Sequence, residues 1–403
     1  MKKSKYSASN LRHLRIFTSV GTLGSQHLAA RAEGLSQPAV SQAISSVETL
    51  FATHLFRRSR SGMQLNKAGE AAFGRLTRMF TLLRQINTDS GALRHNAFDN
   101  RLTMAHLKTL VAVVSTKGFT AAAKNLDLAV PTVHRATRNL EKLVGAPLIE
   151  RSGANFEPTL LGEELARISG LALRELEAAF EDVDDLRGRL AGRISLGALP
   201  LARSDILPNA IGDLCDKNPR ASVDLMSADY DTLLRSLRHG ALDLLLGASR
   251  GKHLSADISE IILFEDSLSV FARAGHPLAG KPSITIDQLA RYPWIAPHLG
   301  TPTRTDFDSL FGALDLPQGL ISTSSLVVIR SLLARSDRLT LLSRRRLLYE
   351  EQQGLLVALD ISLPTTARTI CISIRTGWQP TRLQREFLKI LTQPRPQHVA
   401  DKM

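Results

Sequence analysis

The sequence predicts a multidomain α/β protein in which two copies of a small helical unit precede a larger domain of alternating strands and helices. Three observations predict this organisation: an internal repeat, an uneven distribution of charge, and a change of hydrophobic period near Arg193. The chain has 403 residues, of which 43% are hydrophobic and 22% charged. This is the composition of a globular protein, and the length allows two or three domains with apolar cores.

The repeat has an offset of 93 residues and superposes residues 13–70 on residues 106–163 without a gap. Identical residues at equivalent positions include His13 and His106, Pro38 and Pro131, Glu48 and Glu141, Leu55 and Leu148, Arg58 and Arg151, and Gly69 and Gly162. Two copies of this length indicate tandem domains rather than a solenoid of short repeats.

Hydrophobic spacing predicts three short helices and a hairpin in each copy. The third helix carries an inward-facing stripe of apolar residues. The stripe consists of Val40, Ile44 and Val47 in the first copy and of Val133, Thr137 and Leu140 in the second. Ser36 is a favourable N-cap for this helix, and Pro38 fits its first turn because an N–H there would have no helical partner.

The excess positive charge lies in the region of the repeat. Residues 1–160 contain 22 Lys and Arg against 9 Asp and Glu, whereas the rest of the chain contains 29 of each class. A basic module joined to a neutral body favours binding of a polyanion such as DNA. The alternative is a generically basic protein without such a partner.

The outer face of the third helix carries hydrogen-bonding side chains of the kinds that contact base edges and phosphates in a major groove. The hairpin that follows is basic in the first copy and much less so in the second. The predicted DNA-binding residues are Ser36, Gln37, Pro38, Ser41, Gln42, Arg57, Arg58 and Arg60 in the first copy and Thr132, His134, Arg135, Arg138 and Arg151 in the second. For any single residue an ordinary solvated helix face is the alternative, and the sequence leaves open which copy reads the operator.

At these residues the sequence resembles the winged helix-turn-helix of LysR-type transcriptional regulators. The run 35–42 (LSQPAVSQ), Glu48, Arg58 and the triplet 68–70 (AGE) match the usual pattern of that family. The second copy departs from it at Ala129 and Val130, where the family usually has Ser-Gln. The resemblance implies a sequence-specific DNA-binding regulator, with the unusual feature that the DNA-binding unit is duplicated.

A long amphipathic helix is predicted after each hairpin, over about 67–86 and about 162–187. Residues 88–100 are expected to connect the two copies. The resemblance implies that the second helix forms a dimer between two chains, and packing against its own chain is the alternative. The expected domains are 8–70 and 101–161 for the two units, 71–100 for the first helix and connection, 162–189 for the second helix, and 190–395 for the C-terminal domain.

The C-terminal domain is expected to contain a mostly parallel sheet and two lobes, lobe I at about 190–264 and 367–395 and lobe II at about 265–366. It resembles the effector domain of the same family, which is similar to type 2 periplasmic solute-binding proteins. Ligands of such sheets bind at the carboxyl ends of strands. The candidate effector-binding residues are Leu199, Pro200, Ser204, Gly247, Pro297, Thr301, Thr303, Thr323 and Ser324.

A helix cap is the alternative role for each of these Ser and Thr residues. A resemblance to the branch of the family that serves sugar and aromatic-acid catabolism suggests an aromatic or sugar-derived carboxylate as effector. The expected partners are therefore double-stranded DNA, this small molecule and further copies of the chain in a homodimer or homotetramer, with RNA polymerase as an additional candidate. A ligand-independent architectural DNA-binding protein with a degenerate sensor is the competing hypothesis.

Other classes of protein find little support. The sequence has no glycine-rich phosphate loop, no metal-ligand spacing and no nucleophile motif, so we expect neither an enzyme nor a bound cofactor or metal. Cys215 and Cys371, far apart, exclude a disulfide framework. The basic start of the chain is not followed by the apolar run of a signal peptide, and no stretch approaches the length of a membrane span. We therefore expect a cytoplasmic protein.

Overall fold

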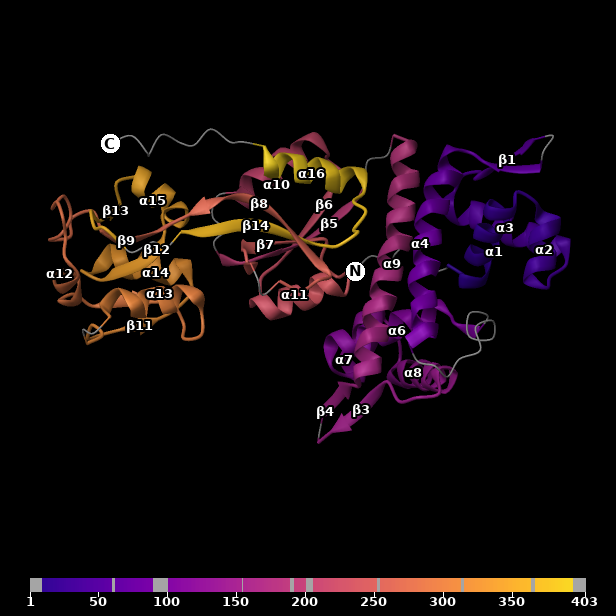
Figure 1. Ribbon diagram of the computed structural model, residues 1–403, viewed down its shortest axis with the longest axis horizontal. Helices are drawn as coiled ribbons and strands as arrows, with labels where there is room; N and C mark the ends of the chain where they lie inside the picture. Colours follow the sequence, from indigo (N-terminus) through magenta and orange to yellow (C-terminus); the bar gives the residue numbers. More distant parts are fainter. Residues whose placement is uncertain are drawn as a thin grey trace.

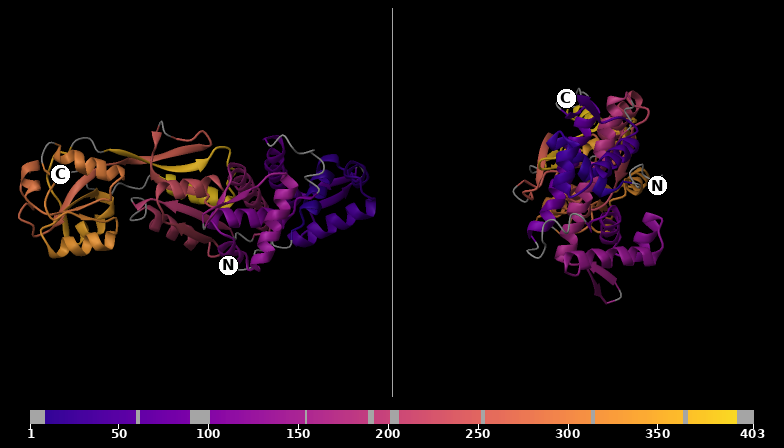
Figure 2. Two further views of the ribbon diagram at one scale, coloured as in Figure 1. Left: turned by 90° about the horizontal axis from the view of Figure 1, so that it is seen from below. Right: turned by 90° about the vertical axis from the view of Figure 1, so that its right-hand side faces the viewer.

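A computed structural model describes residues 9–59, 62–89, 101–153, 155–188, 192–200, 206–251, 254–312, 315–363 and 367–393. The molecule is elongated. The two repeated units and their long helices occupy one end, followed along the long axis by lobe I and then lobe II (Figures 1 and 2). No helix in these ranges is long and apolar enough to cross a membrane.

The structure confirms the repeat element by element. The first unit consists of α1 (Leu11–Leu23), α2 (Gln26–Glu33), α3 (Gln37–Phe51), β1 (Phe56–Ser59), β2 (Gly62–Leu65) and α4 (Lys67–Asp89). The second consists of α6 (Met104–Thr116), α7 (Phe119–Leu126), α8 (Val130–Val144), β3 (Ile149–Ser152), β4 (Asn155–Pro158) and α9 (Leu160–Leu186). Each element of the second unit begins 93 residues after its counterpart, so both sequences specify the same local structure.

The same turns close the three short helices in both units, although the residues differ. A left-handed residue follows each of these helices: Gly24, Gly34 and Ala52 in the first unit and Lys117, Asp127 and Gly145 in the second. Such a residue satisfies helix carbonyls that would otherwise lack donors, and glycine adopts this conformation at least cost. Glycine therefore follows the first two helices in the first unit but only the third helix in the second unit. At the other helix ends a residue with a side chain adopts the left-handed conformation, at a higher conformational free energy.

Two identical residues fix the hairpin in each unit. One carboxylate oxygen of Glu48 accepts hydrogen bonds from the backbone N–H groups of Leu55 and Phe56, and Glu141 does the same for the second hairpin. At Gly69 and at Gly162 a Cβ atom would overlap a backbone carbonyl oxygen of the hairpin. Only glycine therefore allows the long helix to begin this close to the hairpin.

The predicted inward stripe of the third helix is confirmed, since all six of its residues are buried. Ser36 caps α3 by accepting a hydrogen bond from the N–H of Ala39, as predicted. Ala129 occupies the equivalent position of α8 and provides no side-chain cap. The N–H of Thr132, equivalent to that of Ala39, donates instead to the backbone carbonyl oxygen of Ala129 at 2.9 Å, so the first turn of α8 closes without a side-chain cap.

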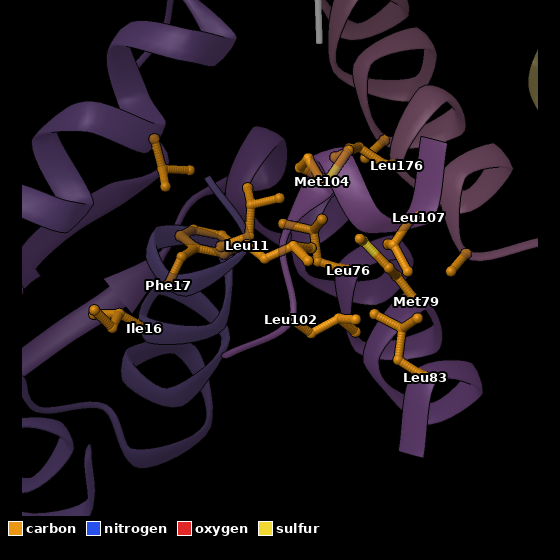
Figure 3. Packing of buried hydrophobic residues seen from close by; sticks show 14 of the residues in the cluster. Leu11, Ile16, Phe17, Leu76, Met79, Leu83, Leu102, Met104, Leu107 and Leu176 are labelled. Carbon is orange, nitrogen blue, oxygen red and sulfur yellow. The ribbon is translucent and has the colours of Figure 1, made fainter. Parts of the chain in front are cut away.

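Helices α4 and α9 pack side by side and antiparallel (Figure 1). Arg75 pairs with Asp182 and Arg78 with Glu175, so moving forward along α4 moves backward along α9. Between them lies a continuous apolar core. It includes Leu76, Met79 and Leu83 of α4, Leu165, Ile168, Leu176 and Val183 of α9, and residues from both small units (Figure 3).

This packing corrects one expectation. The apolar stripe of the 162–187 helix was predicted to pair with a second chain, but α4 of the same chain covers it. A stripe of this kind requires a partner helix, and the duplication supplies one within the chain. Thr88 and Asp89, expected in the connection, belong to α4, and the connection at 90–100 lies outside the described residues.

Lobe I has a five-stranded sheet of order β6-β5-β7-β14-β8. Its strands are β5 (Arg193–Ala198), β6 (Ser222–Met226), β7 (Leu244–Ala248), β8 (Ile258–Asp266) and β14 (Arg368–Arg375). Its helices are α10 (Ile206–Lys217), α11 (Tyr230–Arg238) and α16 (Arg382–Thr392). Strands β6, β5 and β7 are parallel, whereas β14 pairs antiparallel with both β7 and β8.

Lobe II has a second five-stranded sheet, of order β11-β10-β12-β9-β13. Its strands are β9 (Leu268–Arg273), β10 (Trp294–Ala296), β11 (Ile321–Ser322), β12 (Leu339–Ser343) and β13 (Leu356–Ala358). Its helical segments are α12 (Ile286–Ala290), α13 (Pro302–Phe311), α14 (Leu326–Arg335), the 3₁₀ turn Arg344–Arg346 and α15 (Leu348–Gln352).

The expectation of a mostly parallel sheet holds with one exception in each lobe: β14 in lobe I and β9 in lobe II run opposite to the other four strands of their sheets. The cause is the two-lobed connection. The chain leaves lobe I along β8 and returns along β14, and these strands run antiparallel to each other. The outgoing strand β8 is followed almost at once by β9 of lobe II, which pairs antiparallel with β12 and β13.

Candidate DNA-recognition helices and effector cleft

The N-terminal part of α3 presents its predicted residues to solvent. Ser36, Gln37, Pro38, Ser41 and Gln42 are all exposed, while the opposite face of the helix is buried in its unit. Two amide side chains and two hydroxyls thus form a polar surface at the start of a helix. Such a surface can donate and accept hydrogen bonds at base edges.

The equivalent face of α8 has a different chemistry. Arg135 and Arg138 are exposed, and Thr132 is half-buried. The ring of His134 was expected to point outward, but it stacks on Phe119 at 3.7 Å between centroids and meets the edge of Phe156. The first unit has Gln26, Ser41 and Met63 at these three positions. The aromatic cluster is therefore a feature of the second unit that holds one face of the His134 ring.

The hairpins carry the remaining DNA-binding candidates. Arg57 of β1 is exposed, and its counterpart in β3 is Glu150, which is also exposed. Arg58 belongs to β1 and its partner across the hairpin is Met63, whereas Arg60 lies outside the described residues. Arg151 is exposed, and its Nε donates to the carbonyl oxygen of Gly153 at 3.1 Å.

The effector-site candidates lie at the carboxyl ends of strands in both lobes. In lobe I, Leu199 and Pro200 follow β5, and Gly247 lies near the end of β7. In lobe II, Pro297 follows β10, Thr323 and Ser324 follow β11, and Thr301 and Thr303 begin α13. Ser204 lies outside the described residues. Arg368, at the start of β14, links these two edges because its guanidinium donates to Thr303 at 2.7 Å and pairs with Asp306 of α13.

Comparison with known proteins connects these features. The pattern described as "Bacterial regulatory helix-turn-helix protein, lysR family" matches residues 11–70 and again residues 104–163. The pattern "LysR substrate binding domain" matches residues 187–394, about half of the chain. The chain belongs to the LysR family. It is a DNA-binding transcription regulator with an effector-binding domain.

Two relatives match this chain over different lengths. The chain is 33% identical over 370 residues to the HTH-type transcriptional regulator GalR of Pseudomonas putida, covering 91% of this chain and 93% of GalR. It is 28% identical over 286 residues to PcaQ of Agrobacterium fabrum, covering 70% of this chain and 92% of PcaQ. GalR is thus about as long as this chain, and PcaQ is shorter by about one repeat.

A solved structure supports the fold. A full-length OxyR variant from Pseudomonas aeruginosa superposes with a TM-score of 0.56 at 22% identity, covering 72% of this chain and 93% of OxyR. That coverage is what a LysR regulator with a single DNA-binding unit would give.

Most hydroxyl groups proposed for the effector site of this LysR regulator also have structural roles. Thr301 caps α13 by accepting from the N–H of Arg304, and Thr323 accepts from the N–H of Ser325. Ser324 is exposed. The side chain of Leu199 lies directly over Gly247, where a Cβ would meet Leu199 Cδ1 at 2.5 Å. Gly247 therefore provides room for Leu199 and is itself covered.

Sequence reasoning missed the charged residues at the edge of lobe I. Arg250 follows β7, and its guanidinium lies over the ring of Tyr230, 4.0 Å from the centroid. Burial raises the pKa of Tyr230, and the positive charge of Arg250 opposes that shift. Arg250 Nε is buried and has no hydrogen-bond partner among the described residues. An arginine two residues after a buried parallel strand was the available sequence signal.

Lobe I is fastened to α9 by a row of ion pairs. Arg235 of α11 lies 2.6 Å from Glu163, and His239 Nε2 lies 3.0 Å from the same carboxylate. Further along α9, Arg174 Nε lies 3.0 Å from Oδ1 of Asp243, the residue just before β7. At Gly170 a Cβ would overlap the carbonyl oxygen of His239, so the two bodies are in direct backbone contact. The effector domain is thus packed directly against α9, the long helix of the second DNA-binding unit.

Proposed function

We propose that this regulator binds promoter DNA through α3, α8 and their hairpins, and that a small carboxylate in the cleft between the lobes alters this binding. The aromatic or sugar-derived class of the effector, an assembly of two or four chains, contact with RNA polymerase and a cytoplasmic location belong to the same proposal. The observation that carries it is the pair of arginines, Arg250 and Arg368, at the carboxyl edge of the lobe I sheet.

Charge and exposure support the DNA-binding part. Exposed Gln37 and Gln42 on α3 and Arg135 and Arg138 on α8 present the groups that pair with adenine and guanine edges. The excess positive charge of the first 160 residues supplies phosphate contacts, so the affinity for DNA should fall steeply as salt is raised.

The chemistry of the arginines supports a carboxylate effector. A guanidinium can hold a carboxylate through two parallel hydrogen bonds. Arg250 has a buried Nε without a partner among the described residues, and Tyr230 beneath it offers an aromatic face. Arg368 already bridges to Thr303 and Asp306 of lobe II. An effector carboxylate close to Arg368 would compete with Asp306 and change the contact between the lobes.

Transmission would follow from the connection to α9. Because lobe I is held to α9 through Glu163 and Asp243, a change in the lobe arrangement acts on the α4–α9 pair and on both units attached to it. The effector must bind one arrangement of the lobes better than the other for this to occur. Any assembly of chains would use surfaces other than the apolar stripe of α9, which α4 covers.

A gel-shift assay with the DNA upstream of the gene tests the DNA-binding part. We compare the wild type with Ser36→Ala/Gln37→Ala/Arg58→Ala and with His134→Ala/Arg135→Ala/Arg138→Ala. Loss of specific binding in both variants indicates that both units read DNA, and loss in one variant assigns recognition to that unit. If the wild type prefers this DNA no more than random DNA, sequence-specific binding at that promoter is refuted.

Thermal melting tests the effector part. Benzoate, hydroxybenzoates, gluconate and succinate are each added, with benzamide as the uncharged match for benzoate. A ligand of the folded state raises the melting temperature by mass action. We expect one carboxylate to raise it and to change the gel shift, and Arg250→Ala to abolish both effects. If no carboxylate acts, the ligand-independent architectural hypothesis is favoured.

A further inference from the structure

The third helices of the two units differ at the positions proposed to contact DNA. Gln37 and Gln42 of α3 correspond to Val130 and Arg135 of α8, and Ser45 corresponds to Arg138. Gln42, Ser45, Arg135 and Arg138 are all exposed. Glutamine pairs best with adenine, whereas arginine pairs best with the two acceptors of guanine. The two helices therefore favour different bases.

The two units are also joined as a pair within one chain. The equivalent helices α4 and α9 pack antiparallel, as two copies related by an approximate two-fold axis would. One apolar core contains residues of α1 and α3 of the first unit, of α6 and α8 of the second, and of both long helices. Phe51, at the end of α3, stacks on Phe180 of α9 with 4.2 Å between ring centroids. The pair is thus a single packed body.

Buried charge contributes to this pairing. Arg75 of α4 is 5% exposed and lies 2.6 Å from Asp182 of α9. The same guanidinium donates to the backbone carbonyl of Gln379 in the effector domain at 2.7 Å. Separating α4 from α9 would part this arginine from Asp182 and Glu175. Together with the shared apolar core, these contacts hold the two units of the chain to each other as a pair.

We propose that one chain recognises a complete operator made of two dissimilar half-sites, one read by α3 and rich in adenine contacts, the other read by α8 and rich in guanine contacts. A homodimer built on single units presents two identical recognition helices and so selects a palindromic site. Duplication followed by divergence removes that requirement. This inference rests on the proposed function, because it assumes that both units bind DNA.

Selection from random double-stranded DNA by the purified full-length chain tests the inference. For the wild type we expect an enriched site with two different halves, occupied by one chain in mass photometry on the shortest selected duplex. The variant Ala129→Ser/Val130→Gln/Thr132→Ala/His134→Ser/Arg135→Gln/Arg138→Ser gives α8 the recognition residues of α3. We expect it to enrich a site with two similar halves.

A second variant, with fewer substitutions, controls for misfolding of the first. Arg135→Gln/Arg138→Ser changes only exposed side chains and should weaken binding to the wild-type site by roughly tenfold or more through the guanine-rich half alone. A palindromic wild-type site, or two chains on the shortest duplex, would overturn the inference while leaving DNA binding intact. No enrichment of any sequence would overturn the proposed function as well.

Discussion

Arg174 of α9 and Asp243 of lobe I form an ion pair at the junction of the DNA-binding and effector domains, with 3.0 Å between Nε and Oδ1. Asp243 is 1% exposed, and its other oxygen accepts from the N–H of Ser195 in β5 at 2.9 Å. Glu181 lies 3.0 Å from the same arginine, and burial raises the pKa of Glu181 and of nearby Glu177. Arg174 therefore compensates the buried Asp243 and two half-buried glutamates.

Removing this arginine should destabilise the protein strongly. Arg174→Ala leaves Asp243 buried without its cation, and we expect the free energy of unfolding to fall by about 3 kcal/mol. Urea denaturation measures the change. The control is Arg382→Ala, which breaks another pair with α9, to Asp185, in which the arginine is 62% exposed. The free energy of unfolding of Arg382→Ala should fall by at most about 0.5 kcal/mol. Equal decreases in the two variants would refute the idea that burial makes the Arg174–Asp243 pair more important for stability.

The exchange of glycine for alanine between the units gives a reciprocal prediction. Ala52 and Gly145 occupy the same left-handed position after the third helix, with φ of 52° and 78°. Ala52→Gly should stabilise the protein by about 1 kcal/mol, and Gly145→Ala should destabilise it by about the same amount. No atom lies near a Cβ at Gly145, so backbone conformation alone is tested. Thermal melting of both variants provides the measurement, and changes of the same sign would contradict it.

Substitution of glycine by alanine should have opposite effects at the start of the long helices and further along α4. Gly69 and Gly162 lie against a hairpin, and Gly74 does not. Gly69→Ala and Gly162→Ala would each force a Cβ onto a hairpin carbonyl, so we expect a loss of several kcal/mol or no folded protein. Gly74→Ala lies within α4 with open space around it and should stabilise that helix by about 0.5–1 kcal/mol. Circular dichroism during urea titration compares the three, and a tolerated Gly162→Ala would show that the hairpin can shift.

Sequence reasoning predicted the local structure better than the long-range contacts. The stripe of Val133, Thr137 and Leu140 fixes which face of α8 is buried, because the helical period depends only on near neighbours. The apolar stripe of α9 indicated that a partner was needed but could not indicate which chain supplied it. Whether α4 or a second chain covers Leu176 depends on three-dimensional packing.

The same limit applies to the candidate sites. Hydroxyl groups at helix starts were visible in the sequence, and Thr301 and Ser36 are indeed caps. The position of Arg250 over Tyr230 could not be predicted, because the two residues follow different strands that only the sheet brings together. Nor does helical period show that His134 stacks on Phe119, which belongs to another helix.

The burial of His239 against α9 predicts a pH dependence. Burial lowers the pKa of His239 below its usual value of 6.5, although the charge of Glu163 opposes the shift. The unfolded chain therefore binds a proton more readily than the folded one between the lowered pKa and 6.5. Stability from this group is complete above pH 6.5 and is lost as the pH falls through that window.

Urea denaturation at several pH values between 7.5 and 5.5 measures this effect. We expect the free energy of unfolding of the wild type to decrease across this range. His239→Gln retains a hydrogen-bond donor for Glu163 but cannot titrate, so its stability should decrease less over the same range. His106 and His276, whose pKa values burial also lowers, remain in the variant and should maintain part of the slope. Identical slopes for the two proteins would show that His239 takes up its proton equally in the folded and unfolded states.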